Sequence, residues 1–344
     1  MNPIEKIAIG TSGVEVTRLG LGGAPLSGME LADGIFQGSA YDEALRLIQR
    51  AYDLGVRYFD TAPMYGNGRS EVRYGRVLRQ VPRQSFVMST KVSRLFVPLG
   101  AVHEAAENPD GVPEYEMHFD FSAEGVRRSL EGSLKRLGME QVEILYLHDS
   151  DFVGQHSDSE FAEGLEAVSA LRQEGLVKAI GMGMNQWEVS ERMVARFDLD
   201  LILLAGRYTL LEQSALPEFL PRCLERGTQV AIGGPYNSGI LARDLDQPVS
   251  FEYQPAPPHL VHKARRLKAV CDRHGVELKA AALQFLFGHA AVATAVPGAA
   301  TVAELEDNLR LMEVEIPAGV WQELKEEGLL SEDTPTPSSQ GLTH

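Results

Sequence analysis

The fold is indicated first by one stretch, Val56-Arg57-Tyr58-Phe59-Asp60-Thr61-Ala62-Pro63-Met64-Tyr65-Gly66, in which a short apolar run ends on a carboxylate. Two later apolar runs also end on a chemically capable side chain, the first on Lys91 and the second on His148. In an eight-stranded α/β barrel the carboxyl ends of the strands share one rim, and the βα loops build the active site there. The three runs therefore predict three barrel strands that bring Asp60, Lys91 and His148 to one face.

The rest of the chain alternates between strand-like and helix-like patterns, which is typical of right-handed parallel crossovers. An N-terminal β-hairpin is expected over 6–9 and 14–17, before a first buried strand over 18–23. Further strands are expected to end at Asp60, Lys91 and His148 and to cover 177–183, 200–206, 228–232 and 292–296, with helices over 42–54, 70–80, 123–137, 160–174, 188–196 and 215–226. Repeated strand–helix units, and the lack of a GxGxxG motif after the first strand, favour a (β/α)8 TIM barrel over an open doubly wound sheet.

Two segments, 94–121 and 233–258, are too long and too rich in proline or glycine to be ordinary connections. Loops of this length in a compact domain are commonly lids or binding loops, and both segments leave the carboxyl end of a strand. We therefore expect long βα loops over the active face. The chain is interpreted as one domain over 1–330, followed by a flexible Ser/Thr/Pro-rich tail over 331–344.

The composition narrows the class of protein. Of 344 residues, 44% are hydrophobic and 23% are charged, as in ordinary soluble proteins. A formal net charge of −16 argues against a nucleic-acid partner, and no run is apolar for long enough to span a bilayer. Cys223 and Cys271 stand far apart and no signal-peptide pattern opens the chain, so we expect a cytoplasmic protein without disulfides. No metal-ligand spacing is present, since His103 and His118 are interpreted as solvated loop residues, and the oligomeric state stays open.

The motifs at these strand ends resemble those of the aldo-keto reductases, and the similarity extends from the N-terminal hairpin to about Leu311. It is carried by Phe59-Asp60-Thr61-Ala62-Pro63-Met64-Tyr65-Gly66-Asn67-Gly68-Arg69-Ser70-Glu71, Ser89-Thr90-Lys91 and Leu147-His148-Asp149. The resemblance implies a catalytic tetrad of Asp60, Tyr65, Lys91 and His148. A further likeness to the aldose 1-dehydrogenase branch, which includes L-fucose and D-threo-aldose dehydrogenases and a pyridoxal 4-dehydrogenase, is carried by Phe119-Asp120-Phe121-Ser122, Gly181-Met182-Gly183-Met184-Asn185 and Gly233-Gly234-Pro235-Tyr236-Asn237-Ser238-Gly239-Ile240-Leu241.

The implied tetrad suits hydride exchange between an alcohol carbon and a nicotinamide. The phenol of Tyr65, with an ordinary pKa of about 10, needs help to act as a base at neutral pH. A nearby Lys91 ammonium would lower that pKa, Asp60 would keep Lys91 charged, and His148 would donate a hydrogen bond to the substrate oxygen. Taken singly, Asp60 is also compatible with a turn cap, and Lys91 with the Schiff-base lysine of an aldolase.

The resemblance also implies a site for NAD or NADP. Cofactor contacts are expected at Gly23, Asn185, Tyr208, Gly234, Tyr236, Asn237, Ser238, Gly239, Leu241, Pro297, Gly298, Glu304 and Asn308. The stretch Gly233–Leu241 would lie along the pyrophosphate, because glycine permits close approach and backbone amides donate to anionic oxygens. Taken alone, this stretch is also compatible with an ordinary Gly/Pro turn.

The chain departs from the wider family at the nicotinamide. Ala205 stands where relatives carry a carboxamide-binding glutamine, and Gly233 stands where they carry a stacking tyrosine. Asn185 would still bind the carboxamide. The space left by the small residues would accept another ring, from Tyr208 or Tyr236.

Two residues expected beside the adenosine of the cofactor indicate whether the protein prefers NAD or NADP. Gly298 and Glu304 stand where NADP-preferring relatives have lysine and arginine. A carboxylate there would repel a 2′-phosphate but accept a hydrogen bond from a free ribose 2′-hydroxyl. We therefore expect NAD to be preferred over NADP, unless Glu304 is only a solvated acid at a helix start.

The expected activity is NAD(P)-dependent oxidation of a cyclic hemiacetal to the lactone. Both C1 of an aldose such as L-fucose and the cyclic form of pyridoxal present this group, so the tetrad does not separate them. Substrate recognition is expected from Met64, Ser93, Trp187 and the 94–121 loop. The alternatives are a general NADPH-dependent carbonyl reductase and, from another class, a nucleotide-binding regulatory subunit on the same barrel.

Overall fold

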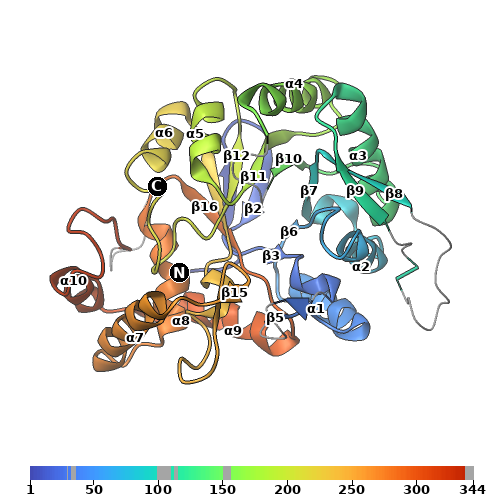
Figure 1. The fold of residues 1–344 in the computed structure, drawn as a ribbon. Helices are drawn as coiled ribbons and strands as arrows, with labels where there is room; N and C mark the ends of the chain where they lie inside the picture. The colour runs from blue at the N-terminus through green and yellow to red at the C-terminus, as the bar shows by residue number, and fades with distance from the viewer. Residues whose placement is uncertain (29, 32–35, 99–109, 112–114, 150–155, 338–344) are drawn as a thin grey trace.

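The structure, a computed structural model, describes residues 1–28, 30–31, 36–98, 110–111, 115–149 and 156–337. Eight parallel strands form one sheet (Figure 1), in the order β3 (Leu21–Gly22), β6 (Tyr58–Asp60), β7 (Val87–Val92), β10 (Ile144–Asp149), β11 (Ala179–Met184), β12 (Leu201–Ala205), β13 (Gln229–Gly233) and β16 (Val292–Val296). Backbone bridges from Leu19 to Ala295 and from Gly22 to Gly298 join the outer strands. The sheet therefore curls into a nearly closed barrel, and the predicted (β/α)8 architecture is confirmed.

Helices surround the barrel (Figure 1): α1 (Tyr41–Asp53), α2 (Arg69–Leu78), α3 (Ala123–Leu137), α4 (Asp158–Gln173), α5 (Trp187–Val194), α6 (Phe219–Arg226), α7 (Pro258–Arg273), α8 (Leu278–Phe285), α9 (Val302–Glu313) and α10 (Ala318–Glu326). The ends of α3 have clear local causes. Ser122 caps its start by accepting a hydrogen bond from the Gly125 amide, and Gly138 ends it with a φ of 62°. The boundaries predicted from the sequence, 123–137, are confirmed.

The N-terminal hairpin closes one end of the barrel. It consists of β1 (Lys6–Ile9) and β2 (Val14–Thr17), which pair antiparallel as predicted. Ile9, Val14 and Val16 join an apolar cluster with residues from the inside of the barrel strands. Because the amino ends of the strands are covered in this way, the interior of the barrel is reached from the opposite rim.

The two long segments contain more structure than their sequences predict. In the first, β8 (Arg94–Pro98) pairs antiparallel with β9 (Tyr115–Phe119), and in the second β14 (Ser250–Phe251) pairs with β15 (Gln254–Pro255). A further short pair, β4 (Glu30–Leu31) with β5 (Phe36–Gln37), lies near the N-terminus. Such short strands give almost no periodic signal. The tip of the first segment, with His103, lies outside the described residues.

The start of the predicted flexible tail is packed. Thr334 is 1% exposed and its hydroxyl lies 2.7 Å from that of Ser331. The backbone of Pro335 and Thr336 approaches Gly288 so closely that a Cβ there would lie 2.7 Å from it. Of the predicted tail, residues 331–337 belong to the described part of the chain, and these contacts place the start of the tail against the barrel domain.

The cysteines and the apolar segments of the chain can be located in the structure as follows. Cys223 and Cys271 are both free and buried. Across the described part of the chain, no helix has the length and apolar character needed to cross a membrane.

Candidate active site

A buried ion pair joins β6 to β7 at the open rim. The Lys91 ammonium donates to the two carboxylate oxygens of Asp60 at 3.0 and 2.8 Å, and to the carbonyl of Thr61 at 2.8 Å. Both side chains are almost fully buried. Burial lowers the pKa of Lys91, and the adjacent Asp60 carboxylate opposes that shift by favouring the ammonium form. The predicted proximity of these two groups is confirmed.

A series of buried hydroxyl groups connects the Asp60 carboxylate to the interior of the barrel. Ser89 donates to Asp60 at 2.7 Å, its oxygen lies 3.2 Å from the hydroxyl of Tyr58, and the Tyr58 and Tyr146 hydroxyls lie 2.9 Å apart. These hydroxyls were not predicted from the sequence, because polar residues on the inner face of a barrel strand lie within apolar runs. The signal that could have found Ser89 is its spacing of two from Lys91, which places both side chains on one face of β7.

Tyr65 and His148 complete the set of four predicted catalytic side chains. Tyr65 follows β6, and the Lys91 nitrogen lies 4.8 Å from the centre of its ring. The rings of Tyr65 and His148 meet edge to face, with centres 6.2 Å apart and an interplanar angle of 85°. Ser93 donates to the backbone carbonyl of His148 at 2.6 Å. The structure therefore brings all four side chains together at one rim.

His148 is held in its neutral form. Its pKa is well below the usual histidine value, first because the ring is buried and then because the cations of Arg94 and Lys91 disfavour a further positive charge. A neutral imidazole carries one N–H that can donate to an oxygen. The arrangement thus combines one ammonium, one phenol and one neutral donor.

These groups open into a cavity of about 510 Å³ that extends to the start of α9. Most of the predicted site residues line it: Gly23, Asp60, Met64, Tyr65, His148, Asn185, Gly234, Tyr236, Ser238, Gly239, Gly298, Glu304 and Asn308. Lys91 lies beneath the lining. A cavity of this size is in the usual range for small-molecule and cofactor sites.

The wall beside β13 and β16 fits a dinucleotide. A Cβ at Gly22 would lie 2.7 Å from the carbonyl of Val296, and one at Gly298 would lie 2.5 Å from the ring of Pro25, so both glycines allow neighbouring segments of the chain to pack closely beside the cavity. Arg243 and Lys279 add two cations to the same lining. Bare backbone beside cations suits a pyrophosphate.

Several lining residues were missed by the sequence analysis: Pro25, Arg243, Tyr253, Lys279 and Asp307. Arg243 and Tyr253 belong to the long 233–258 segment, whose path only tertiary structure defines. Lys279 lies on α8 and Asp307 on α9, where they form an ion pair with each other. No local pattern distinguishes these charged residues from ordinary charges on a helix surface.

At the far end of the cavity Glu304 and Asn308, which are predicted at the adenosine end, lie together with Tyr236, which the sequence predicts along the pyrophosphate or at the nicotinamide. The Tyr236 hydroxyl donates to the Asn308 side chain at 2.7 Å, and burial raises the Tyr236 pKa so that it remains a neutral phenol. The Glu304 carboxylate accepts from the amide of Ala300 at 2.7 Å. Its own amide donates to Thr301, which caps α9. Glu304 therefore has a helix-capping role in addition to lining the cavity.

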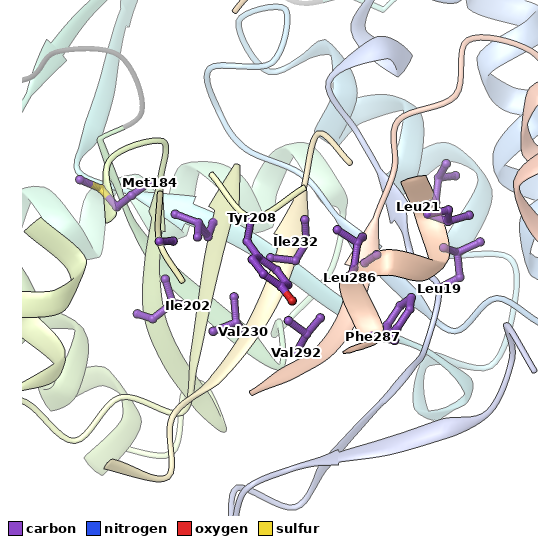
Figure 2. Close-up of a cluster of buried hydrophobic side chains, with 14 of the residues drawn as sticks. Leu19, Leu21, Met184, Ile202, Tyr208, Val230, Ile232, Leu286, Phe287 and Val292 are labelled. Carbon is purple, nitrogen blue, oxygen red and sulfur yellow. The ribbon is translucent and has the colours of Figure 1, made fainter. Parts of the chain in front are cut away.

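The prediction that Tyr208 supplies a ring at the nicotinamide is corrected by the structure. Tyr208 is fully buried and lies in the apolar core beside Ile232 and Leu286 (Figure 2). Its ring centre is 5.2 Å from that of Phe285. The chain turns inward after β12 and buries the ring, which the sequence of this loop does not reveal.

Other predicted contacts have structural partners rather than positions on the cavity wall. Asn237 accepts a hydrogen bond from Thr209 at 2.6 Å and donates to the carbonyl of Gly206 at 3.1 Å, so it shapes its own loop. Leu241 is buried in the core. In the described part of the protein, the cavity lining does not include Ser93, Trp187, Asn237, Leu241 or Pro297.

Comparison with solved structures supports the fold. An aldo-keto reductase from Bacillus halodurans in its holo form superposes with a TM-score of 0.73, at 23% identity, covering 94% of this chain and 95% of that one. A glycerol dehydrogenase from Gluconobacter oxydans gives a TM-score of 0.74, at 20% identity, covering 99% of both chains.

Sequence comparison finds relatives of higher identity than the solved structures, and their activities are known by name. The chain is 37% identical to pyridoxal 4-dehydrogenase from Microbacterium luteolum, over 95% of this chain and 98% of that protein. It is 39% identical to D-threo-aldose 1-dehydrogenase from Pseudomonas sp, over 96% and 98% respectively. The model of the Aldo/keto reductase family matches residues 18–327. The chain therefore belongs to the aldo/keto reductase family and is an NAD(P)-dependent oxidoreductase.

Proposed function

We propose that the protein oxidises a cyclic hemiacetal to a lactone with NAD as the preferred acceptor. The observation that carries this proposal is the identity of 37–39%, over nearly the whole chain, to a pyridoxal and an aldose dehydrogenase. The presence of Asp60, Tyr65 and His148 in the lining of the cavity, with Lys91 buried beneath them, supports the same chemistry. The free cysteines agree with a reducing compartment, and we propose a cytoplasmic enzyme with a single domain over 1–330.

Each residue of the tetrad has a defined task in this proposal. His148 donates its N–H to the hydroxyl oxygen of the hemiacetal and sets the orientation of the reacting carbon. Tyr65 removes the hydroxyl proton, because the Lys91 ammonium beside its ring favours the phenolate. Asp60 holds Lys91 charged and in place. NAD bound along the glycine-lined wall would accept the hydride, and the products are the lactone, reduced cofactor and one proton.

Purified protein should reduce NAD in the presence of a hemiacetal. We expect multiple turnovers with pyridoxal, L-fucose or another D-threo-aldose, measured as the initial rate of reduced-cofactor formation with NAD and NADP in parallel. Identification of the lactone as product excludes simple aldehyde oxidation. Lack of turnover with every hemiacetal, combined with reduction of ordinary aldehydes by NADPH, would assign the protein to general carbonyl reduction instead.

Cofactor choice provides a separate test at the adenosine end. Glu304→Arg should raise the NADP-to-NAD ratio of kcat/KM by at least roughly tenfold, because it replaces a charge that repels a 2′-phosphate with one that attracts it. Glu304→Gln keeps an acceptor for the Ala300 amide and removes only the charge, so it should shift the ratio in the same direction by less. An unchanged ratio in both variants would show that Glu304 serves α9 alone.

A further inference from the structure

A second cavity, of about 440 Å³, lies at the opposite end of the barrel. Its lining comes from the β1–β2 hairpin and from the segments that lead into β6, β7, β10 and β11. It is therefore separate from the catalytic rim, at the face that in barrel enzymes usually serves stability. Its charged lining residues are Lys6, Arg57, Arg83, Lys178, Glu15 and Glu143.

This lining carries four cations against two carboxylates, in a chain whose formal net charge is −16. Both carboxylates already have partners. Glu143 accepts from the Met88 amide at 3.0 Å and from Arg83 at 2.7 Å, and Glu15 lies 3.7 Å from Lys6. The cavity wall thus keeps an excess of positive charge that the rest of this acidic protein lacks.

Two of the cations have no carboxylate partner among the residues that the structure describes. Within the described residues, neither Arg57 nor Lys178 forms an ion pair with a carboxylate. Arg57 is nevertheless fixed in place, since it donates to the carbonyls of Tyr52 and Val56 at 2.6 and 2.8 Å and lies over the Tyr52 ring. A fixed guanidinium without a counter-ion is well suited to an external anion.

Arg83 is a further fixed cation in this wall. Its guanidinium donates to the Glu143 carboxylate at 2.7 Å and to the carbonyls of Gln141 and Phe86 at 2.9 and 3.2 Å, and it lies 4.8 Å from the centre of the Phe86 ring. Because Glu143 balances its charge, Arg83 shapes the wall, and the positive charge open to an anion comes from Arg57 and Lys178.

We propose that this cavity binds a small molecule carrying a phosphoryl or polycarboxylate group. The cations come from several loops around it, so an anion with oxygens on two centres would contact more of them than a single halide would. Binding here would leave the catalytic cavity free, because the two cavities lie at opposite ends of the barrel. The ligand and the cofactor would therefore bind together.

The test is calorimetric titration of the enzyme saturated with NAD, so that the catalytic cavity cannot accept the probe. Inorganic pyrophosphate and citrate are titrated separately, with sodium chloride of equal ionic strength as the reference. We expect one site per chain for at least one probe, and the stronger binder identifies the class of anion. Lys178→Gln, at an exposed position, should weaken that binding at least roughly threefold, and Arg57→Gln/Lys178→Gln at least roughly tenfold.

Lys268→Gln is the matched control, because it removes one exposed lysine on α7 outside this cavity and should leave binding unchanged. Absence of binding by both anions to the parent would overturn the proposal. So would equal affinities in the parent, the control and Lys178→Gln. If the double variant proves unstable, the single exposed substitution still decides the question.

Discussion

Replacement of Tyr65 by phenylalanine is expected to lower kcat by about 10²–10⁴-fold, the usual contribution of a positioned acid or base. The substitution removes one oxygen and keeps the ring beside Lys91 and His148. Because the hydroxyl is needed when the proton moves, the KM values should change far less than kcat. Steady-state rates with NAD and the best hemiacetal, together with cofactor binding measured by fluorescence, provide the comparison.

Tyr236→Phe is the matched control, since it removes a hydroxyl from the same cavity but at the adenosine end. Its lost partner is Asn308, so it should raise the KM for the cofactor a few-fold and change kcat little. A decrease in kcat of less than about tenfold in Tyr65→Phe would assign the proton transfer to another group. If both variants lost the same activity, the hydroxyl of Tyr65 would have no special role.

Much of the fold could be predicted because its signals are local. The apolar runs that end at Asp60, Lys91 and His148 are strands, and residues 123–137 form a helix with the expected caps. The strand pairs β4–β5, β8–β9 and β14–β15 could not be predicted in this way. The pairing of β8 with β9 joins residues about twenty positions apart, and the anchor between them, Asp110 bound by Arg73 at 2.9 Å, depends on a residue from α2.

The residues of the site also divide into those that local sequence patterns place correctly and those that they do not. Residues fixed by strand ends lie where their sequence positions indicate, because the carboxyl end of a barrel strand has only one rim to face. Residues of the connecting loops do not follow this rule. Tyr208 turns into the core, whereas Tyr236, in an equally unpatterned loop, reaches the cavity. Which of the two loop tyrosines contacts a ligand depends on how each packs against α8 or α9. This packing cannot be predicted from a local sequence pattern.

The second large effect is expected at the Asp60–Lys91 pair. Lys91→Met should lower the free energy of unfolding by about 3–5 kcal/mol, because it leaves the Asp60 carboxylate buried without its counter-ion. Activity should also fall by at least roughly 10²-fold, since the ammonium beside Tyr65 is lost. Urea unfolding and steady-state rates measure the two effects. Lys268→Met, which removes an exposed pair with Asp272, should cost less than about 1 kcal/mol.

The variant Asp60→Asn/Lys91→Met separates stability from catalysis. Removing both charges abolishes the unpaired buried carboxylate, so most of the lost stability should return, because two neutral groups need no mutual compensation. Activity should not return, because a neutral pair provides no positive charge to favour the phenolate of Tyr65. Recovery of stability together with activity would mean that the pair is only a structural bridge between β6 and β7. Recovery of neither would mean that the packing of Lys91 against the ring of Tyr65 and the carbonyl of Thr61, rather than its charge, holds this rim together.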